Sequence, residues 1–102
     1  MGAIAEEAAA AHKARGNEHF KSGDDAAAIE QYSKGVALCG DTPSLAATRV
    51  ALLANRAACH LRRGDHVSCV MDCDAALHVD GRAATARGLR DAARGRYVRP
   101  AW

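Results

Sequence analysis

Apolar residues recur along the chain at the three- and four-residue spacing of an α-helix. Five helices are predicted: one from about residue 4 to a break at 23–24, one ending near 39, and three over about 44–63, 65–79 and 82–95. In the second helix the stripe contains Ala28, Ile29, Tyr32 and Val36. A stripe of this kind buries one face of a helix against its neighbours, so the pattern predicts an all-α protein.

Glycine and aspartate separate the predicted helices. Gly-Asp pairs at 23–24 and 64–65 each follow an apolar stripe. Glycine allows the left-handed conformation that ends one helix, and the aspartate side chain caps the next. The segment 40–43 ends with a proline and stops the second helix, while Gly88 is expected to interrupt the fifth. Gly95-Arg96-Tyr97 is similar to another turn between helices.

The chain repeats itself at an offset of 41 residues. This offset superimposes the two Gly-Asp turns, His19 on His60, and Gly16 on Ala57. A constant offset that keeps turns and small residues predicts two copies of a helix–turn–helix unit in a single domain, residues 1–102. The units are expected over about 9–42 and 50–83, with an incomplete third unit or capping helix over about 82–99.

Composition supports this prediction, because 25 of the 102 residues are alanine, the best helix former and a poor strand former. The formal charge of +2 is uneven: residues 1–80 carry a net charge of −3, and 81–102 carry six arginines against one aspartate. A basic end indicates either an anionic partner or a solvated tail. There is no secretory signal pattern and no apolar run near the ~20 residues of a membrane span, so we expect a cytoplasmic protein with reduced cysteines.

Aligned on Gly16, the two units resemble the tetratricopeptide repeat, a helix–turn–helix unit of about 34 residues with small residues at fixed sites. The matching sites are His12, Arg15, Gly16, His19, Ala28, Tyr32 and Gly40 in the first unit, and Leu53, Arg56, Ala57, His60, Cys69, Cys73 and Gly81 in the second. The seven extra residues of the offset are placed at 41–47, where they would lengthen the third helix at its start. The resemblance implies a concave groove that most often binds an extended peptide.

Two local strings are similar to those of co-chaperone members of this family. Lys13-Ala-Arg-Gly-Asn-Glu-His-Phe20 resembles K-x-x-G-N-x-x-F, and Asn55-Arg-Ala-Ala58 resembles N-R-A-A. The resemblance implies that Lys13, Asn17 and Asn55 belong to a five-residue carboxylate clamp for the C-terminal Glu-Glu-Val-Asp of seventy- and ninety-kilodalton heat-shock chaperones. Lysine offers a point charge, and asparagine amides both donate and accept hydrogen bonds. Phe20 is expected to form or support the apolar part of the groove.

The other two clamp positions are basic in the family and lie four residues apart in the first helix of the third unit. Continuing directly from the second unit puts Thr85 and Leu89 there, whereas aligning on Gly88 puts Arg82 and Ala86 there. Basic residues near these positions are therefore candidates by proximity alone. They are Arg82, Arg87 and Arg90.

The rest of the sequence contains few patterns that are typical of metal binding or catalysis. His66-x-x-Cys69-x-x-x-Cys73 has some likeness to a metal motif, but both cysteines occupy packing sites of the repeat and no second ligand pair is present. No metal or cofactor is expected. The sequence lacks a nucleophile elbow, a phosphate loop and a paired-carboxylate site, so an enzyme is not expected.

The sequence therefore predicts a cytoplasmic tetratricopeptide adaptor that binds the acidic C-terminal tail of a heat-shock chaperone. One alternative is a scaffold with a lost clamp, in which a homodimer covers the uncapped end of the stack. Another is an anionic partner bound through the arginine-rich end. This second alternative, an acidic protein or nucleic acid, ranks last because no stacking platform is evident, and no membrane partner is expected.

Overall fold

A computed structural model describes residues 2–96. These residues form five α-helices and one short 3₁₀ helix, and they contain no strand, which confirms the all-α class. The elements are α1 (Gly2–Lys21), α2 (Asp25–Cys39), the 3₁₀ helix η1 (Pro43–Leu45), α3 (Ala46–Arg62), α4 (His66–Val79) and α5 (Ala84–Arg96). Within the described range, no helix combines the length and apolar character that crossing a membrane requires.

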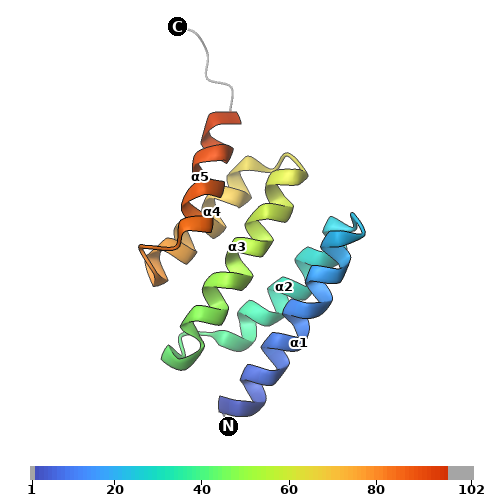
Figure 1. The fold of residues 1–102 in the computed structure, drawn as a ribbon, viewed down its shortest axis with the longest axis vertical. Coiled ribbons are helices and arrows are strands. Elements are labelled where there is room, and N and C mark those ends of the chain that lie inside the picture. The colour runs from blue at the N-terminus through green and yellow to red at the C-terminus, as the bar shows by residue number, and fades with distance from the viewer. Residues whose placement is uncertain (1, 97–102) are drawn as a thin grey trace, which may run out of the picture.

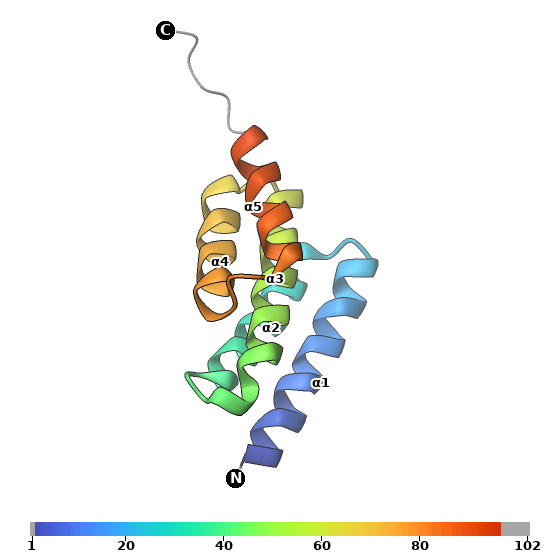
Figure 2. The same ribbon diagram turned by 60° about the vertical axis from the view of Figure 1, so that its left-hand side comes forward.

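The helices pack as antiparallel neighbours around α3 (Figures 1 and 2). The two predicted helix–turn–helix units are α1–α2 and α3–α4, and α5 packs against both helices of the second unit. In Figure 1, α3 lies in the middle of the molecule, with α1 on one side and α5 on the other. Residues 97–99 of the predicted third unit lie outside the described part of the chain.

The two Gly-Asp turns have the predicted geometry. Gly23 and Gly64 adopt φ values of 84° and 81°, which an L side chain rarely adopts. The next residue in each turn, Asp24 or Asp65, accepts a 3.1 Å hydrogen bond from the backbone N–H three positions later. Both helices that follow are therefore capped by their own aspartate.

Three expectations about helix continuity were wrong. Helix α5 runs through Gly88 without interruption and continues to Arg96, so Gly95 and Arg96 form no turn; Tyr97 lies outside the described residues. A helical glycine costs only about 1 kcal/mol, and the alanines and arginines around it are good helix formers. Residues 41–45 form a turn and η1 rather than a continuous extension of α3, because Pro43 is confined to the start of a helix.

Two apolar clusters fill the interior, and α3 contributes to both. Cluster one joins α1, α2, η1 and α3 through Ala9, Ala28, Tyr32, Cys39, Leu45, Leu52 and Cys59. Cluster two joins α3, α4 and α5 through Leu53, Ala57, Cys69, Cys73, Ala76, Ala86 and Ala93. Neighbouring residues on a helix point about 100° apart, so Leu52 and Leu53 face different clusters.

Candidate functional site

Helix α1 packs tightly against Tyr32 of α2 at Gly16. A Cβ atom on this glycine would lie 2.4 Å from the Tyr32 ring, so only glycine fits. The ring therefore reaches across α1, and the Tyr32 hydroxyl donates a 2.6 Å hydrogen bond to Asn17 Oδ1. Burial raises the pKa of Tyr32 to about 12, so its hydroxyl stays a protonated donor well beyond the pH at which an exposed tyrosine ionises.

Asn17 and Asn55 meet between α1 and α3. Asn55 Nδ2 donates to Asn17 Oδ1 over 3.2 Å, so this oxygen accepts two hydrogen bonds. Among the described residues, the Asn17 amide N–H groups have no hydrogen-bond partner, so the side chain presents donors. Lys13 lies four residues before Asn17 on the same face of α1, is partly buried, and makes no ion pair within residues 2–96. The structure thus places three of the predicted clamp residues near one another.

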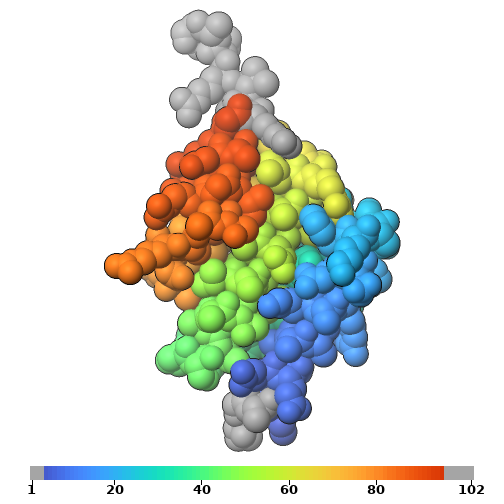
Figure 3. Space-filling view, viewed as in Figure 1, coloured from blue at the N-terminus to red at the C-terminus, as the bar shows by residue number. Residues whose placement is uncertain are grey.

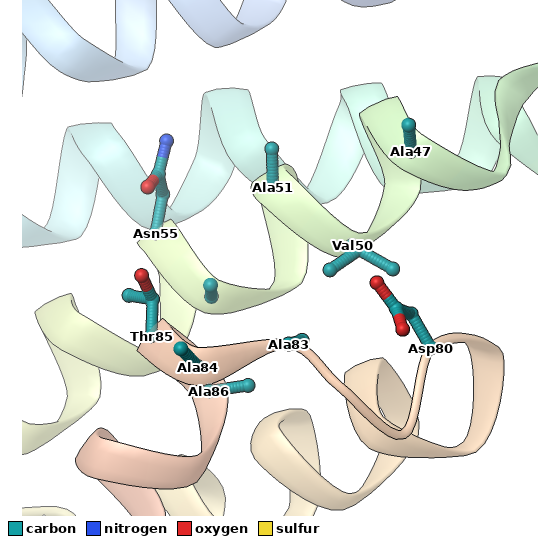
Figure 4. Close-up of a pocket in the computed structure, with 10 residues that line it drawn as sticks. Ala47, Val50, Ala51, Asn55, Asp80, Ala83, Ala84, Thr85 and Ala86 are labelled. Atoms are coloured by element: carbon teal, nitrogen blue, oxygen red, sulfur yellow. The ribbon is translucent and has the colours of Figure 1, made fainter.

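A pocket of about 280 Å³ lies beside Asn55, between α3 and the start of α5. Most of its wall is alanine, and Figure 4 shows Ala47, Ala51 and Asn55 along one side of α3. The residues that line it are Ala47, Val50, Ala51, Ala54, Asn55, Asp80, Ala83, Ala84, Thr85 and Ala86. In Figure 3, the surface of α3 is visible between α5 and α1, so this face is open to a ligand.

Phe20 lies at the far end of α1 and is only partly exposed. It packs against cluster one, and the guanidinium of Arg62 covers its ring at 3.8 Å from the centroid. Arg62 also donates to the Phe20 carbonyl and to Asp25. Phe20 thus helps hold α1, α2 and α3 together, and its role in the groove stays a prediction.

Burial in α5 shows how the third unit aligns with the second. Leu52 and Cys59 of α3 are buried against the first unit, and Ala86 and Ala93, 34 residues later, are buried against the second. The repeat therefore continues directly, so Thr85 and Leu89 occupy the positions that are basic in the family. Thr85 is exposed beside the pocket, whereas Leu89 packs against cluster two.

The three candidate arginines lie elsewhere. Arg90 pairs with Asp74 of α4 at 3.2 Å, and Arg87 donates to the Gly81 carbonyl at 2.8 Å. Arg82 is exposed in the turn that precedes α5. None of these three lines the pocket, so the described structure brings them to neither Asn55 nor Thr85.

Sequence reasoning missed a polar contact that joins α2, α3 and α4. Arg56 donates two hydrogen bonds to Asp72 of α4, over 2.8 and 2.7 Å, and one to Ser33 of α2 over 3.0 Å. The hydrogen bonds to Asp72 raise the pKa of Arg56 above its ordinary, already high value. The 41-residue offset contained one signal of this contact. It aligns Arg56 and Asp72 with Arg15 and Gln31, so the second unit has two opposite charges where the first has an arginine and a neutral glutamine.

The cysteines are packing residues, as interpreted from the repeat. All four are free and buried, and burial raises the pKa of Cys59 to about 11 and that of Cys73 to about 12. A raised pKa disfavours the reactive thiolate. Across residues 2–96, no group of three or more histidine, cysteine or acidic side chains is arranged to hold a metal ion.

The fold and these contacts define an all-α protein of stacked helix–turn–helix repeats. The chain is 44% identical over 68 residues to sperm-associated antigen 1 of Rattus norvegicus, covering 66% of this chain and 8% of that protein. It is 37% identical over 68 residues to protein unc-45 homolog B of Xenopus laevis, covering 67% and 7% of the two chains. It is 39% identical over 70 residues to mitochondrial import receptor subunit TOM34 of Homo sapiens, covering 69% and 20%.

These similarities support a tetratricopeptide-repeat domain. The matched part is a small section of each relative, 8% of the rat protein for example. No protein-family model matches the chain, and no solved structure matches it significantly.

Proposed function

We propose that this chain is a cytoplasmic tetratricopeptide adaptor of the co-chaperone type. Its groove binds the acidic C-terminal tail, of the Glu-Glu-Val-Asp type, of a seventy- or ninety-kilodalton heat-shock chaperone. The observation that carries the proposal is the contact of Asn17 with Asn55 across α1 and α3, with Lys13 on the same face. One relative bears the name of an import receptor subunit, which fits a role in recognition.

The donors of this site suit a peptide carboxylate. Tyr32 and Asn55 occupy the oxygen of the Asn17 amide, which leaves its N–H groups to donate. The Lys13 ammonium adds a positive charge, and charge-assisted hydrogen bonds are stronger than neutral ones. Asn55 keeps its oxygen and one N–H for the peptide backbone.

The third unit supplies fewer basic residues to the site than the family pattern has. Thr85 and Leu89 replace two basic residues there, and Arg82 is exposed three residues before Thr85. Arg87 and Arg90 could contribute only by leaving Gly81 and Asp74. One charge-assisted hydrogen bond is worth about 1.5–3 kcal/mol, so each loss weakens binding about ten- to a hundred-fold. We therefore expect an affinity at or weaker than the micromolar range.

Calorimetry with a peptide ending in Glu-Glu-Val-Asp tests the proposal. The free acid should bind at least ten-fold more tightly than the C-terminally amidated peptide. Lys13→Ala and Asn55→Ala should each reduce affinity about ten-fold, whereas Lys21→Ala, an exposed lysine paired with Glu18, should leave it unchanged. Equal binding of the acid and the amide would overturn the proposal.

A further inference from the structure

The pocket between α3 and α5 has a polar group at each end. Asn55, Ala51 and Ala47 are spaced four residues apart and form one stripe along α3 (Figure 4). Eight residues of helix span about 12 Å. Asn55 marks the end nearest Lys13 and Asn17, and Ala47 marks the other end, toward which Asp80 lies beside Val50.

Asp80 is the one ionisable residue among those that line the pocket. The backbone N–H of Arg82 donates to one carboxylate oxygen over 3.0 Å, which fixes the side chain in the turn after α4. Figure 4 shows the carboxylate turned toward Val50. Asp80 is exposed and forms no ion pair with any residue of the described chain, so its charge is open to a ligand.

We propose that Asp80 is a specificity residue that selects a peptide with lysine or arginine about four residues before the residue held at Asn55. An extended peptide advances about 3.3 Å per residue, so 12 Å corresponds to between three and four residues. An apolar side chain between these two points would enter the alanine-lined pocket. This inference rests on the proposed function, because it needs a peptide whose carboxyl end lies at Lys13, Asn17 and Asn55.

The peptide charge that Asp80 is expected to prefer is opposite in sign to the charge that the clamp prefers. The clamp attracts negative charge at the peptide terminus, whereas Asp80 repels it at the distal end of the pocket. A solvent-exposed charge pair changes affinity by about two- to five-fold, and salt screens it. Recognition would thus favour, by this few-fold factor, an acidic terminus preceded by a basic residue over an acidic tail alone.

A peptide series tests the role of Asp80. Peptides ending in Glu-Glu-Val-Asp carry lysine, glutamine or glutamate immediately before this motif. In a second series the lysine replaces the first glutamate of the motif. Wild type should bind a lysine peptide about five-fold more tightly than the glutamate peptide at low salt. Asp80→Asn keeps an acceptor for the Arg82 N–H and should remove the preference, while Asp80→Lys should reverse it. Asp91→Asn, at an exposed aspartate of α5, is the matched control and should change nothing.

Two bulky variants test whether the peptide uses the pocket. Ala51→Phe should weaken binding of every peptide about ten-fold by filling the pocket, whereas Ala37→Phe, on an exposed face of α2, should not. Equal affinity for lysine and glutamate peptides, with Lys13→Ala still weakening both, would overturn the role of Asp80 and leave the clamp intact. Absence of binding by folded wild type would overturn both proposals.

Discussion

At the scale of single residues, Arg56 links helices through polar contacts. Its guanidinium joins three helices through Asp72 and Ser33, and His60 Nε2 lies 3.5 Å from the same Asp72 carboxylate. The Asp72 side chain is only 10% exposed. A nearly buried carboxylate is stable only while its cation and hydrogen bonds are in place. Arg56 thus holds α4 against α3.

Removing either partner of this ion pair should destabilise the protein. We expect Arg56→Met to lower the free energy of unfolding by about 3 kcal/mol, because it leaves the nearly buried Asp72 carboxylate without its guanidinium partner. The double variant Arg56→Met/Asp72→Leu should recover most of this loss, since it removes both charges. Urea unfolding measures all three proteins, and a loss below about 0.5 kcal/mol in the single variant would contradict the assignment.

Buried acids should make the fold sensitive to alkali. Burial raises the folded-state pKa of Cys59 to about 11 and of Cys73 and Tyr32 to about 12. In the unfolded chain these groups ionise first, from about pH 9 for the thiols. Their contribution to stability is therefore complete below about pH 9 and is lost as the pH rises toward 11 and 12. We expect the urea midpoint, measured under reducing conditions, to fall between pH 8 and pH 10. The fall should be smaller in Cys73→Ala, and a midpoint that rises would refute this assignment.

At the scale of elements, the small-residue sites could be predicted because the repeat aligns them with one another along the sequence. Gly16 and Ala57 were aligned by the repeat, and the structure places Gly16 against the Tyr32 ring. The turns at Gly23 and Gly64 were equally predictable, since a positive φ and an aspartate cap depend on neighbouring residues alone. The end of α5 was not, because glycine only weakens a helix and does not by itself end one.

Two helical glycines should respond oppositely to alanine. Gly16→Ala should destabilise the protein by about 1–2 kcal/mol, because its Cβ would overlap the Tyr32 ring. Gly88→Ala should stabilise it by about 0.5–1 kcal/mol, because nothing lies within 4 Å of a Cβ there and alanine favours the helix. Guanidinium unfolding compares both with wild type. A stabilising Gly16→Ala would show that the ring moves aside without cost.

At the scale of the whole molecule, α3 joins the two clusters. It contacts every other α-helix and contributes Leu52 to one cluster and Leu53 to the other. Helix α5 adds Ala86 and Ala93 as its fully buried side chains, and alanine buries little apolar surface. In a stacked-repeat fold, each element is stabilised by its contacts with neighbouring elements. Helices α3 and α5 should therefore differ in local stability.

Hydrogen exchange should show that α3 is locally more stable than α5. We expect the amides of α3 to exchange most slowly and those of α5 at least ten-fold faster, because α5 can separate without opening cluster one. Exchange measured by mass spectrometry on the native chain resolves the two segments. Equal protection in α3 and α5 would instead indicate that both clusters unfold in one cooperative step.

The sequence by itself determined the helices, the two capped turns and the repeated small-residue sites, because these follow from periodicity and from the chemistry of adjacent residues. It also singled out Asn17 and Asn55, which the structure brings into contact. Tertiary structure alone decided the alignment of the third unit and the partners of Arg56 and Arg90. It also decided the direction of the Asp80 carboxylate. Those outcomes depend on which side chains from distant parts of the chain meet when the helices pack, and a pattern along one helix does not contain that information.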